Sequence, residues 1–306
     1  MIRDISAALA QSLLFACLLA GAGSAAGAPQ GQAMDLTPVT KTVTVGGLSF
    51  PVADYGSGPP VLLLHGFPDD RHLWRYQVPA LAAAGFRVIA PDLRGFGDAP
   101  RPQDPKDYGI PLVVADVIGI LDALGVKQVQ LVAHDWGAAV GWALARQYPD
   151  RITRYVALSV GIGPGPMTIE QLEKSSYMPF FRQAGTAENE LTRDNWKLFR
   201  AWTRNAADTD RYIKNLSRPG ALTAGLNWYR ATGGQPAAPG SVQPVTIPVL
   251  GIWSDGDAYL LESRMTGTKD VVKGPFRYEK ISGASHWMQI DKPAELNRLL
   301  LGFLQK

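Results

Sequence analysis

Cysteine is almost missing from this sequence, and so is any concentration of charge. The one cysteine among 306 residues, Cys17, lies in an apolar N-terminal segment, so without that segment the chain has no disulfide and no thiol chemistry. The net charge is only +3 and no basic stripe is present, which argues against a nucleic-acid partner. The body of the chain also lacks repeats. What remains is a globular sequence, 46% hydrophobic, long enough for one large core and an inserted subdomain.

The N-terminus has the organisation of a secretory signal peptide. Arg3 precedes an apolar segment at residues 5–20, and a run of small residues follows at 21–28. We predict that residues 1–28 form the leader and favour cleavage near Ala26, because a cut after Ala28 would leave Pro29 just beyond it. The alternative is a leader retained as a membrane anchor. With cleavage, we expect a periplasmic or secreted protein without stable membrane association.

Short apolar segments alternate with helical patterns in two parts of the chain. The predicted strands are residues 41–45, 48–55, 61–64, 87–90, the segment leading to His134, 155–160, 249–253 and 277–281. The predicted helices are residues 73–84, 112–124, the segment from the elbow to about residue 148, and a terminal helix from about residue 293. Such alternation predicts an α/β fold with a doubly wound, mostly parallel sheet, formed by residues 29–161 and 243–306.

Residues 162–242 interrupt this alternation. They contain no clear buried strand but several amphipathic stretches rich in aromatic residues. We therefore predict a helical cap that covers an apolar pocket. Its aromatic residues are Tyr177, Phe180, Phe181, Trp196, Phe199, Trp202, Tyr212, Trp228 and Tyr229.

The segment around Asp135 has the pattern of a nucleophile elbow. An apolar strand leads into Ala133-His-Asp-Trp-Gly137, and a helix follows at once. The sharp turn needs small residues at Ala133 and Gly137, because strand and helix approach closely. A carboxylate at the apex is already ionised at neutral pH and attacks a carbon electrophile, leaving an alkyl ester on the enzyme. This chemistry suits epoxides and alkyl halides.

The partners of this nucleophile should follow it along the chain. His286 is the only histidine downstream, and we predict that it is the general base that activates water. An orienting carboxylate is expected after the strand at 249–253, where Asp255 and Asp257 are both candidates. We favour Asp257, because Asp255 suits the turn of an Asp-Gly pair.

The reaction needs two further kinds of group. The backbone N–H groups of Phe67 and Trp136 are predicted to form an oxyanion site. Tyr177 and Tyr229 in the cap are predicted to protonate the departing oxygen, since a phenol with a pKa near 10 keeps its proton at neutral pH. Tyr212 is assigned to packing.

Together these segments resemble the epoxide hydrolases of the α/β-hydrolase superfamily. The resemblance covers nearly everything from about residue 40 to the C-terminus. It is carried by His65-Gly-Phe-Pro68, Asp92-Leu-Arg-Gly-Phe-Gly97, His134-Asp-Trp-Gly137, Tyr177-Met-Pro-Phe-Phe181, Asn227-Trp-Tyr-Arg230 and Gly283-Ala-Ser-His-Trp287. In that family the two tyrosines match the ring-opening acids, and Asp135, Asp257 and His286 match the catalytic triad.

The resemblance implies an α/β-hydrolase fold and hydrolysis of a small apolar epoxide to a vicinal diol, without metal or organic cofactor. The first alternative is a haloalkane dehalogenase with the same nucleophile. That reaction needs N–H donors for the halide, and Phe67 stands where a side-chain donor would be expected. The second alternative is a non-catalytic ligand-binding protein on this fold, which the complete triad disfavours. Sequence leaves the epoxide, its stereochemistry and the oligomeric state open.

Overall fold

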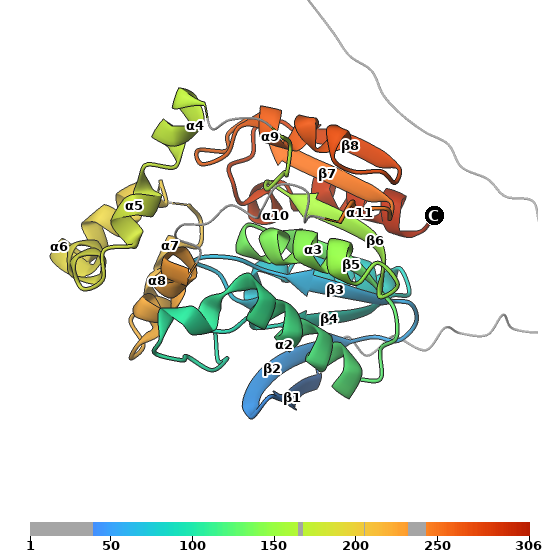
Figure 1. Cartoon of the computed structure of the whole chain (residues 1–306), viewed down its shortest axis with the longest axis horizontal. Helices are drawn as coiled ribbons and strands as arrows, with labels where there is room; N and C mark the ends of the chain where they lie inside the picture. The colour runs from blue at the N-terminus through green and yellow to red at the C-terminus, as the bar shows by residue number, and fades with distance from the viewer. Residues whose placement is uncertain (1–38, 165–167, 205, 232–242) are drawn as a thin grey trace, which may run out of the picture. The chain divides into compact units, whose positions relative to one another are not determined.

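One twisted sheet organises the chain after its N-terminal segment (Figure 1). The structure is a computed structural model that describes residues 39–164, 168–204, 206–231 and 243–306. Its eight-stranded sheet has the order β1-β2-β4-β3-β5-β6-β7-β8. The β1–β2 and β2–β4 pairs are antiparallel and every other pair is parallel, as the alternation of segments predicted.

The strands agree with the predicted segments to within a few residues. They are β1 (Val39–Val45), β2 (Leu48–Tyr55), β3 (Pro60–Leu64), β4 (Arg87–Pro91), β5 (Val129–His134), β6 (Ile152–Leu158), β7 (Val249–Ser254) and β8 (Phe276–Ile281). The central parallel strands are buried on both faces, which is why they are apolar throughout. Gly46 and Gly47 join β1 to β2 with positive φ angles at both positions, the requirement of a tight hairpin turn.

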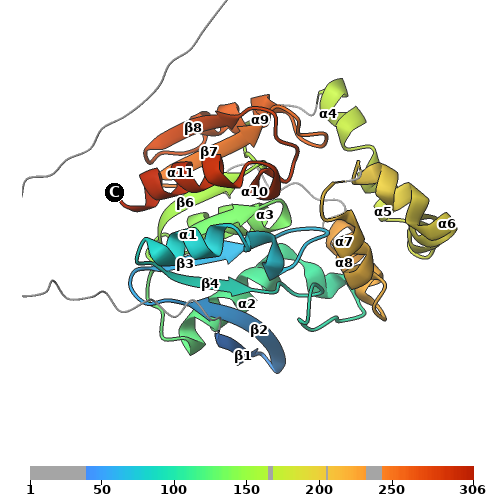
Figure 2. The ribbon, with the colours of Figure 1, turned by 180° about the vertical axis from the view of Figure 1, so that it is seen from behind.

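Helices cover both faces of the sheet. Figure 1 shows α2 and α3 on one face, and Figure 2, from behind, shows α1 and α11 on the other. The core helices and 3-10 turns are η1 (Arg71–Trp74), α1 (Gln77–Ala83), η2 (Pro105–Tyr108), α2 (Ile110–Ala123), α3 (Trp136–Gln147), α9 (Glu262–Thr266), η3 (Gly267–Asp270), α10 (Met288–Asp291) and α11 (Pro293–Leu304). The prediction of a doubly wound α/β-hydrolase fold is confirmed.

The single helix predicted for residues 73–84 is wrong. The structure instead has η1 and then α1, with Arg75 and Tyr76 between them. Pro79 explains the break, because it has no N–H to donate to the carbonyl four residues earlier and its ring would clash there. The helix restarts at Gln77, which places Pro79 in its first turn, where proline is tolerated.

Between β6 and β7 the described residues form helices and no strand of the sheet. The helices are α4 (Ile169–Lys174), α5 (Tyr177–Phe181), α6 (Thr186–Trp202), α7 (Thr209–Leu216) and α8 (Ala221–Ala231). They gather at one end of the sheet (Figures 1 and 2), and we call them the cap. The boundaries 162 and 242 stay predictions, because residues 165–167 and 232–242 lie outside the described ranges.

The predicted leader, residues 1–28, also lies outside the described part of the chain. In the part that is described, no helix has both the length and the apolar character needed to cross a membrane.

Candidate active site

Asp135 lies at a strained turn between β5 and α3. Its φ of 53° and ψ of −124° are unfavourable for a residue with a side chain, as expected at the apex of a nucleophile elbow. A Cβ at position 137 would collide with the backbone of Leu64 and His65, so glycine is required there. The turn therefore places the carboxylate at the carboxyl end of the central strands, beside the N-terminus of α3, whose dipole favours a negative charge.

Backbone donors hold the Asp135 carboxylate in place. The N–H of Phe67, just after β3, donates to Asp135 Oδ1 at 2.8 Å. The N–H of Trp136 donates to the same carboxylate. These are the two groups predicted for the oxyanion site, and the structure brings both to Asp135.

His286 lies between two carboxylates. Its Nε2 is 3.5 Å from Asp135 Oδ2, and its Nδ1 is 2.8 Å from Asp257 Oδ2. The other oxygen of Asp257 accepts the N–H groups of Tyr259 and Leu260 at 2.8 and 3.0 Å. The side chain of Asp257 is fully buried, so these polar partners, and not solvent, fix its direction. The three predicted triad residues are thus assembled from the loops after β5, β7 and β8.

The geometry distinguishes the two candidates for the orienting carboxylate, Asp255 and Asp257. Asp255 is exposed, and its carboxylate accepts the N–H of Gly283 at 2.7 Å, which closes the turn after β8. Of these two aspartates, Asp257 is the one that contacts the imidazole of His286. The turn-forming role expected of Asp255 agrees with this arrangement.

The two carboxylates and the imidazole stabilise one another's charged forms. Burial opposes ionisation of Asp135 and Asp257, but the charge and hydrogen bonds of His286 outweigh it and lower the pKa of both carboxyl groups. Burial likewise favours neutral imidazole, but Asp257 and Asp135 raise the pKa of His286 to about 10. The resting site therefore holds an ionised nucleophile beside a protonated histidine.

Tyr177 begins α5 and Tyr229 lies near the end of α8. Their ring centroids are 5.9 Å apart, and the Tyr229 ring packs edge-on against Trp136 at 5.1 Å. Burial and the charge of Asp135 raise the pKa of both hydroxyl groups well above 10. Both phenols are therefore protonated at neutral pH, and each can donate its proton to an oxygen beside Asp135.

A cavity of about 140 Å³ lies in front of the nucleophile. We call it the inner cavity. Its lining residues are Asp135, Trp136, Ala139, Val160, Tyr177, Met178, Tyr229, Tyr259 and Leu260. Asp135 and the two candidate proton donors, Tyr177 and Tyr229, line this space. The other lining side chains are mainly apolar, so the cavity suits a small apolar molecule with one polar end.

The two other histidines near the site have structural contacts. His65 Nε2 accepts the N–H of Leu93 at 3.0 Å, and burial lowers its pKa to about 4. His134 Nε2 donates to the carbonyl of His286 at 2.9 Å, and burial lowers its pKa to about 3. Both are neutral at pH 7, and His134 anchors the backbone of the predicted base.

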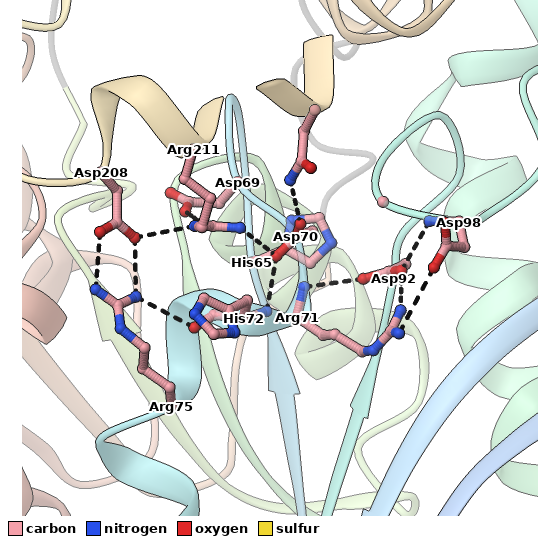
Figure 3. A network of polar contacts seen from close by, with 12 residues as sticks. His65, Asp69, Asp70, Arg71, His72, Arg75, Asp92, Asp98, Asp208 and Arg211 are labelled. Carbon is pink, nitrogen blue, oxygen red and sulfur yellow. Dashed lines mark hydrogen bonds and ion pairs between the residues drawn. The ribbon is translucent and has the colours of Figure 1, made fainter. Parts of the chain in front are cut away.

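A network of ion pairs joins the cap to the loop that carries Phe67 (Figure 3). Arg211 on α7 contacts Asp69 and Asp70 at 2.8 and 2.7 Å, and also contacts Asp208 at 3.1 Å. The second oxygen of Asp69 accepts the indole N–H of Trp287 at 3.0 Å. Arg211 therefore connects the cap to the segments that hold both an oxyanion donor and His286.

Sequence reasoning missed this network, and it missed Tyr259. Asp69 and Arg211 are 142 positions apart, and no motif links them. Tyr259 packs on the His286 ring at a centroid distance of 5.1 Å. Its position two residues after Asp257 was the available signal, because residues beside a catalytic acid tend to face the same space.

Nothing in the described ranges suggests a metal centre, since no group of three or more histidine, cysteine or acidic side chains could hold an ion.

Comparison with known proteins gives a consistent assignment. The family model described as alpha/beta hydrolase fold matches residues 59–293. Epoxide hydrolase A of Mycobacterium tuberculosis is 31% identical over 87% of this chain and 97% of its own length. Epoxide hydrolase 1 of Siraitia grosvenorii is 33% identical over 87% of this chain and 97% of its own.

Solved structures agree. Epoxide hydrolase A of Mycobacterium thermoresistibile has a TM-score of 0.72 and 30% identity, covering 88% of this chain and 98% of that one. An epoxide hydrolase of Bacillus megaterium, solved with an inhibitor, has a TM-score of 0.77 and 27% identity, covering 87% of this chain and 100% of that one. With the family model and the relatives in agreement, the chain belongs to the epoxide hydrolases of the α/β-hydrolase family.

Proposed function

We propose that this epoxide hydrolase works through a covalent alkyl ester on Asp135 and releases a vicinal diol. One observation carries the proposal: the Asp135 carboxylate and the rings of Tyr177 and Tyr229 line the same cavity, and His286 lies behind the nucleophile. This arrangement provides a nucleophile, two acids for the leaving oxygen and a base for the ester.

In the first half-reaction an Asp135 oxygen attacks an epoxide carbon, and the C–O bond to the ring oxygen breaks. The developing alkoxide takes a proton from Tyr177 or Tyr229, so the free oxygen becomes a hydroxyl group. No base is needed, because Asp135 is already ionised. Proton transfer from His286, through water, restores the phenol.

The second half-reaction begins with a change in the pKa of His286. Esterification removes the negative charge of Asp135, so the pKa of His286 falls and the imidazole can lose its proton. Neutral His286, held by Asp257, then takes a proton from water, and hydroxide attacks the ester carbonyl. The oxygen of the tetrahedral intermediate lies where the Phe67 and Trp136 N–H groups point. Collapse breaks the bond between the carbonyl carbon and the ester oxygen, and the departing oxygen takes a proton from protonated His286. The carboxyl group of Asp135 then returns a proton to the imidazole, so the diol leaves beside ionised Asp135 and protonated His286.

The haloalkane alternative has less support. Phe67 places its N–H on Asp135, and its side chain packs against Phe181 and Tyr229 at 5.7 and 5.5 Å, so it offers no donor for a halide. The relatives and solved structures described above are all epoxide hydrolases by name.

The test compares products. The purified protein is incubated with styrene-type and aliphatic epoxides and, in parallel, with haloalkanes, and diol and halide are assayed. We expect diol alone, and we expect none from Asp135→Ala, which should keep the circular dichroism spectrum of the wild type. Halide release, or diol formation by Asp135→Ala at the wild-type rate, would contradict the proposal.

We also propose that the protein acts in the periplasm or outside the cell, after cleavage of its N-terminal leader near Ala26. The support is the order of Arg3, the apolar segment and the run of small residues. Expression of the full chain in a bacterium, cell fractionation and N-terminal sequencing test this. A cytoplasmic protein with an intact N-terminus would contradict it, and an intact N-terminus in the membrane fraction would favour the anchor.

A further inference from the structure

The inner cavity has a neighbouring hollow whose lining does not include Asp135, His286 or Tyr229. A second hollow of about 380 Å³ is lined by Glu173, Lys174, Ser176, Tyr177, Ala201, Trp202, Arg204, Ala258 and Tyr259. We call it the outer cleft. The lining of the inner cavity shares only two residues with it, Tyr177 and Tyr259. These two side chains therefore lie between the two spaces, and their rings are in contact, with centroids 5.6 Å apart.

Only one of the two rings is free of a proposed chemical role. Tyr177 is a candidate acid, whereas the hydroxyl of Tyr259 donates to the carbonyl of Trp202 at 2.6 Å. A phenol has one proton, so that bond occupies the donor of Tyr259. Tyr259 therefore lies beside the catalytic residues without a proton to give to the substrate.

Tyr259 is held at both ends. Its backbone N–H donates to Asp257 Oδ1, its hydroxyl holds the cap, and its ring packs against Trp202 at 5.2 Å and His286 at 5.1 Å. The residue is 6% exposed. A ring fixed in this way acts as a rigid wall and does not swing aside at low cost.

The inner cavity has room for one ring. An apolar protein cavity of about 150 Å³ accommodates benzene, and the inner cavity has about 140 Å³. An epoxide with a single phenyl group or a short alkyl chain is of about this size, whereas a substituent of two rings exceeds the volume of the inner cavity.

We propose that the Tyr259 ring is a partition between the inner cavity and the outer cleft, and that this partition determines the substrate specificity of the enzyme. It confines the substrate to epoxides whose substituent is about the size of one aromatic ring. Removing its ring would join the inner cavity to the outer cleft, so that a second ring could extend into the cleft. This inference rests on the proposed function, because it names the substrates of the same site.

The experiment uses two epoxides that differ by one ring and share the same reactive end, styrene oxide and 4-phenylstyrene oxide. They are compared on the wild type, Tyr259→Phe and Tyr259→Ala. The quantity measured is the ratio of kcat/KM for the two epoxides. Any damage to His286 from the loss of the Tyr259 ring affects both epoxides alike and cancels in this ratio.

We expect the wild type and Tyr259→Phe to favour styrene oxide by about tenfold or more, since overfilling a packed pocket is costly. Tyr259→Ala should lower that preference by about tenfold or more. The partition is overturned if the wild type uses both epoxides equally, or if the ratio for Tyr259→Ala stays within about twofold of the wild type.

Binding can also be measured in a variant that has no turnover. A binding measurement therefore tests this inference separately from the proposed function. The dissociation constants of the two diols are measured by titration with tryptophan fluorescence as the signal. The partition predicts that every variant binds the one-ring diol, and that only Tyr259→Ala binds the biphenyl diol with similar affinity. Equal binding of both diols by the wild type overturns the partition. A wild type that binds the small diol but opens no epoxide counts against the proposed function alone.

Discussion

Tyr177 and Tyr229 are chemically equivalent donors on different helices of the cap. If either phenol can protonate the leaving oxygen, each single change to phenylalanine leaves one donor, and the double change leaves none. We expect partial activity from Tyr177→Phe and from Tyr229→Phe, and a loss of about a thousandfold in kcat/KM from the double variant. Steady-state diol formation measures this.

Tyr212→Phe provides the matched control, because Tyr212 is a buried cap tyrosine that does not line the inner cavity. It should retain most of the activity. Normal epoxide opening by the double variant would mean that Tyr177 and Tyr229 only pack the cap.

In the proposed mechanism His286 is not needed for ring opening but is required as the base in the second half-reaction. Asp135 needs no base to attack, whereas the water that cleaves its ester does. His286→Gln should therefore react once and stop. Intact-protein mass spectrometry should show one adduct per chain with the mass of the epoxide, on the peptide that contains Asp135. An inactive His286→Gln that accumulates no adduct would contradict the two-step assignment.

The site could be predicted from sequence where a residue suited to the chemistry lies in a recognisable local pattern. A carboxylate between Ala133 and Gly137, directly after an apolar strand, is typical of a nucleophile at an elbow, and His286 was the only histidine downstream. The choice between Asp255 and Asp257 was harder, because both follow β7 within three residues. It depends on where the chain turns back, and that turn is fixed by the bond between Asp255 and Gly283.

At the scale of elements, charge joins the cap to the sheet domain. Arg211 on α7 is surrounded by Asp69, Asp70 and Asp208, and its side chain is 21% exposed. Arg211→Ala would leave the largely buried carboxylate of Asp70, whose pKa Arg211 lowers, without its cation. Because breaking a buried ion pair leaves an uncompensated charge, we expect a loss of about 3 kcal/mol or more in the free energy of unfolding, measured with urea.

Arg218→Ala is the matched control, since Arg218 also joins the cap segment to the sheet domain, through the exposed Asp98. Its side chain is 39% exposed and that of Asp98 is 58% exposed, so water screens the pair. The expected loss is about 1 kcal/mol at most. Equal losses for the two variants would show that the Arg211 network adds no more stability than a surface pair.

Elements were predicted best where one strong periodicity runs without interruption. The buried parallel strands and α11, which begins at Pro293 as expected, are of this kind. The break before α1 depended on a single proline inside an otherwise helical pattern. The contacts of Arg211 could not be predicted at all, because they depend on where the cap lies over the strand ends, which no local pattern encodes.

For the whole molecule, two buried histidines make the fold sensitive to acid. His65 and His134 have no exposed surface, and burial lowers their pKa values to about 4 and about 3. In the unfolded chain both titrate near 6.5, so between pH 6.5 and 4 the unfolded state binds more protons than the folded state. Stability is unaffected by these groups above pH 6.5 and is lost as the pH falls below it. Each histidine should cost about 3 kcal/mol by pH 4.

The measurement is urea unfolding from pH 7.5 to 4, compared between the wild type and His65→Gln. Gln has no titrating proton, and its amide can still accept from the N–H of Leu93, the bond that His65 makes at the end of β3. We expect the variant to be less stable than the wild type at pH 7.5, because the smaller side chain packs less well against Phe96. Its stability should nevertheless fall by about 3 kcal/mol less on acidification. An identical pH dependence in the two proteins would mean that His65 is not held neutral by the fold, and that His134 and the carboxylates cause the loss of stability in acid.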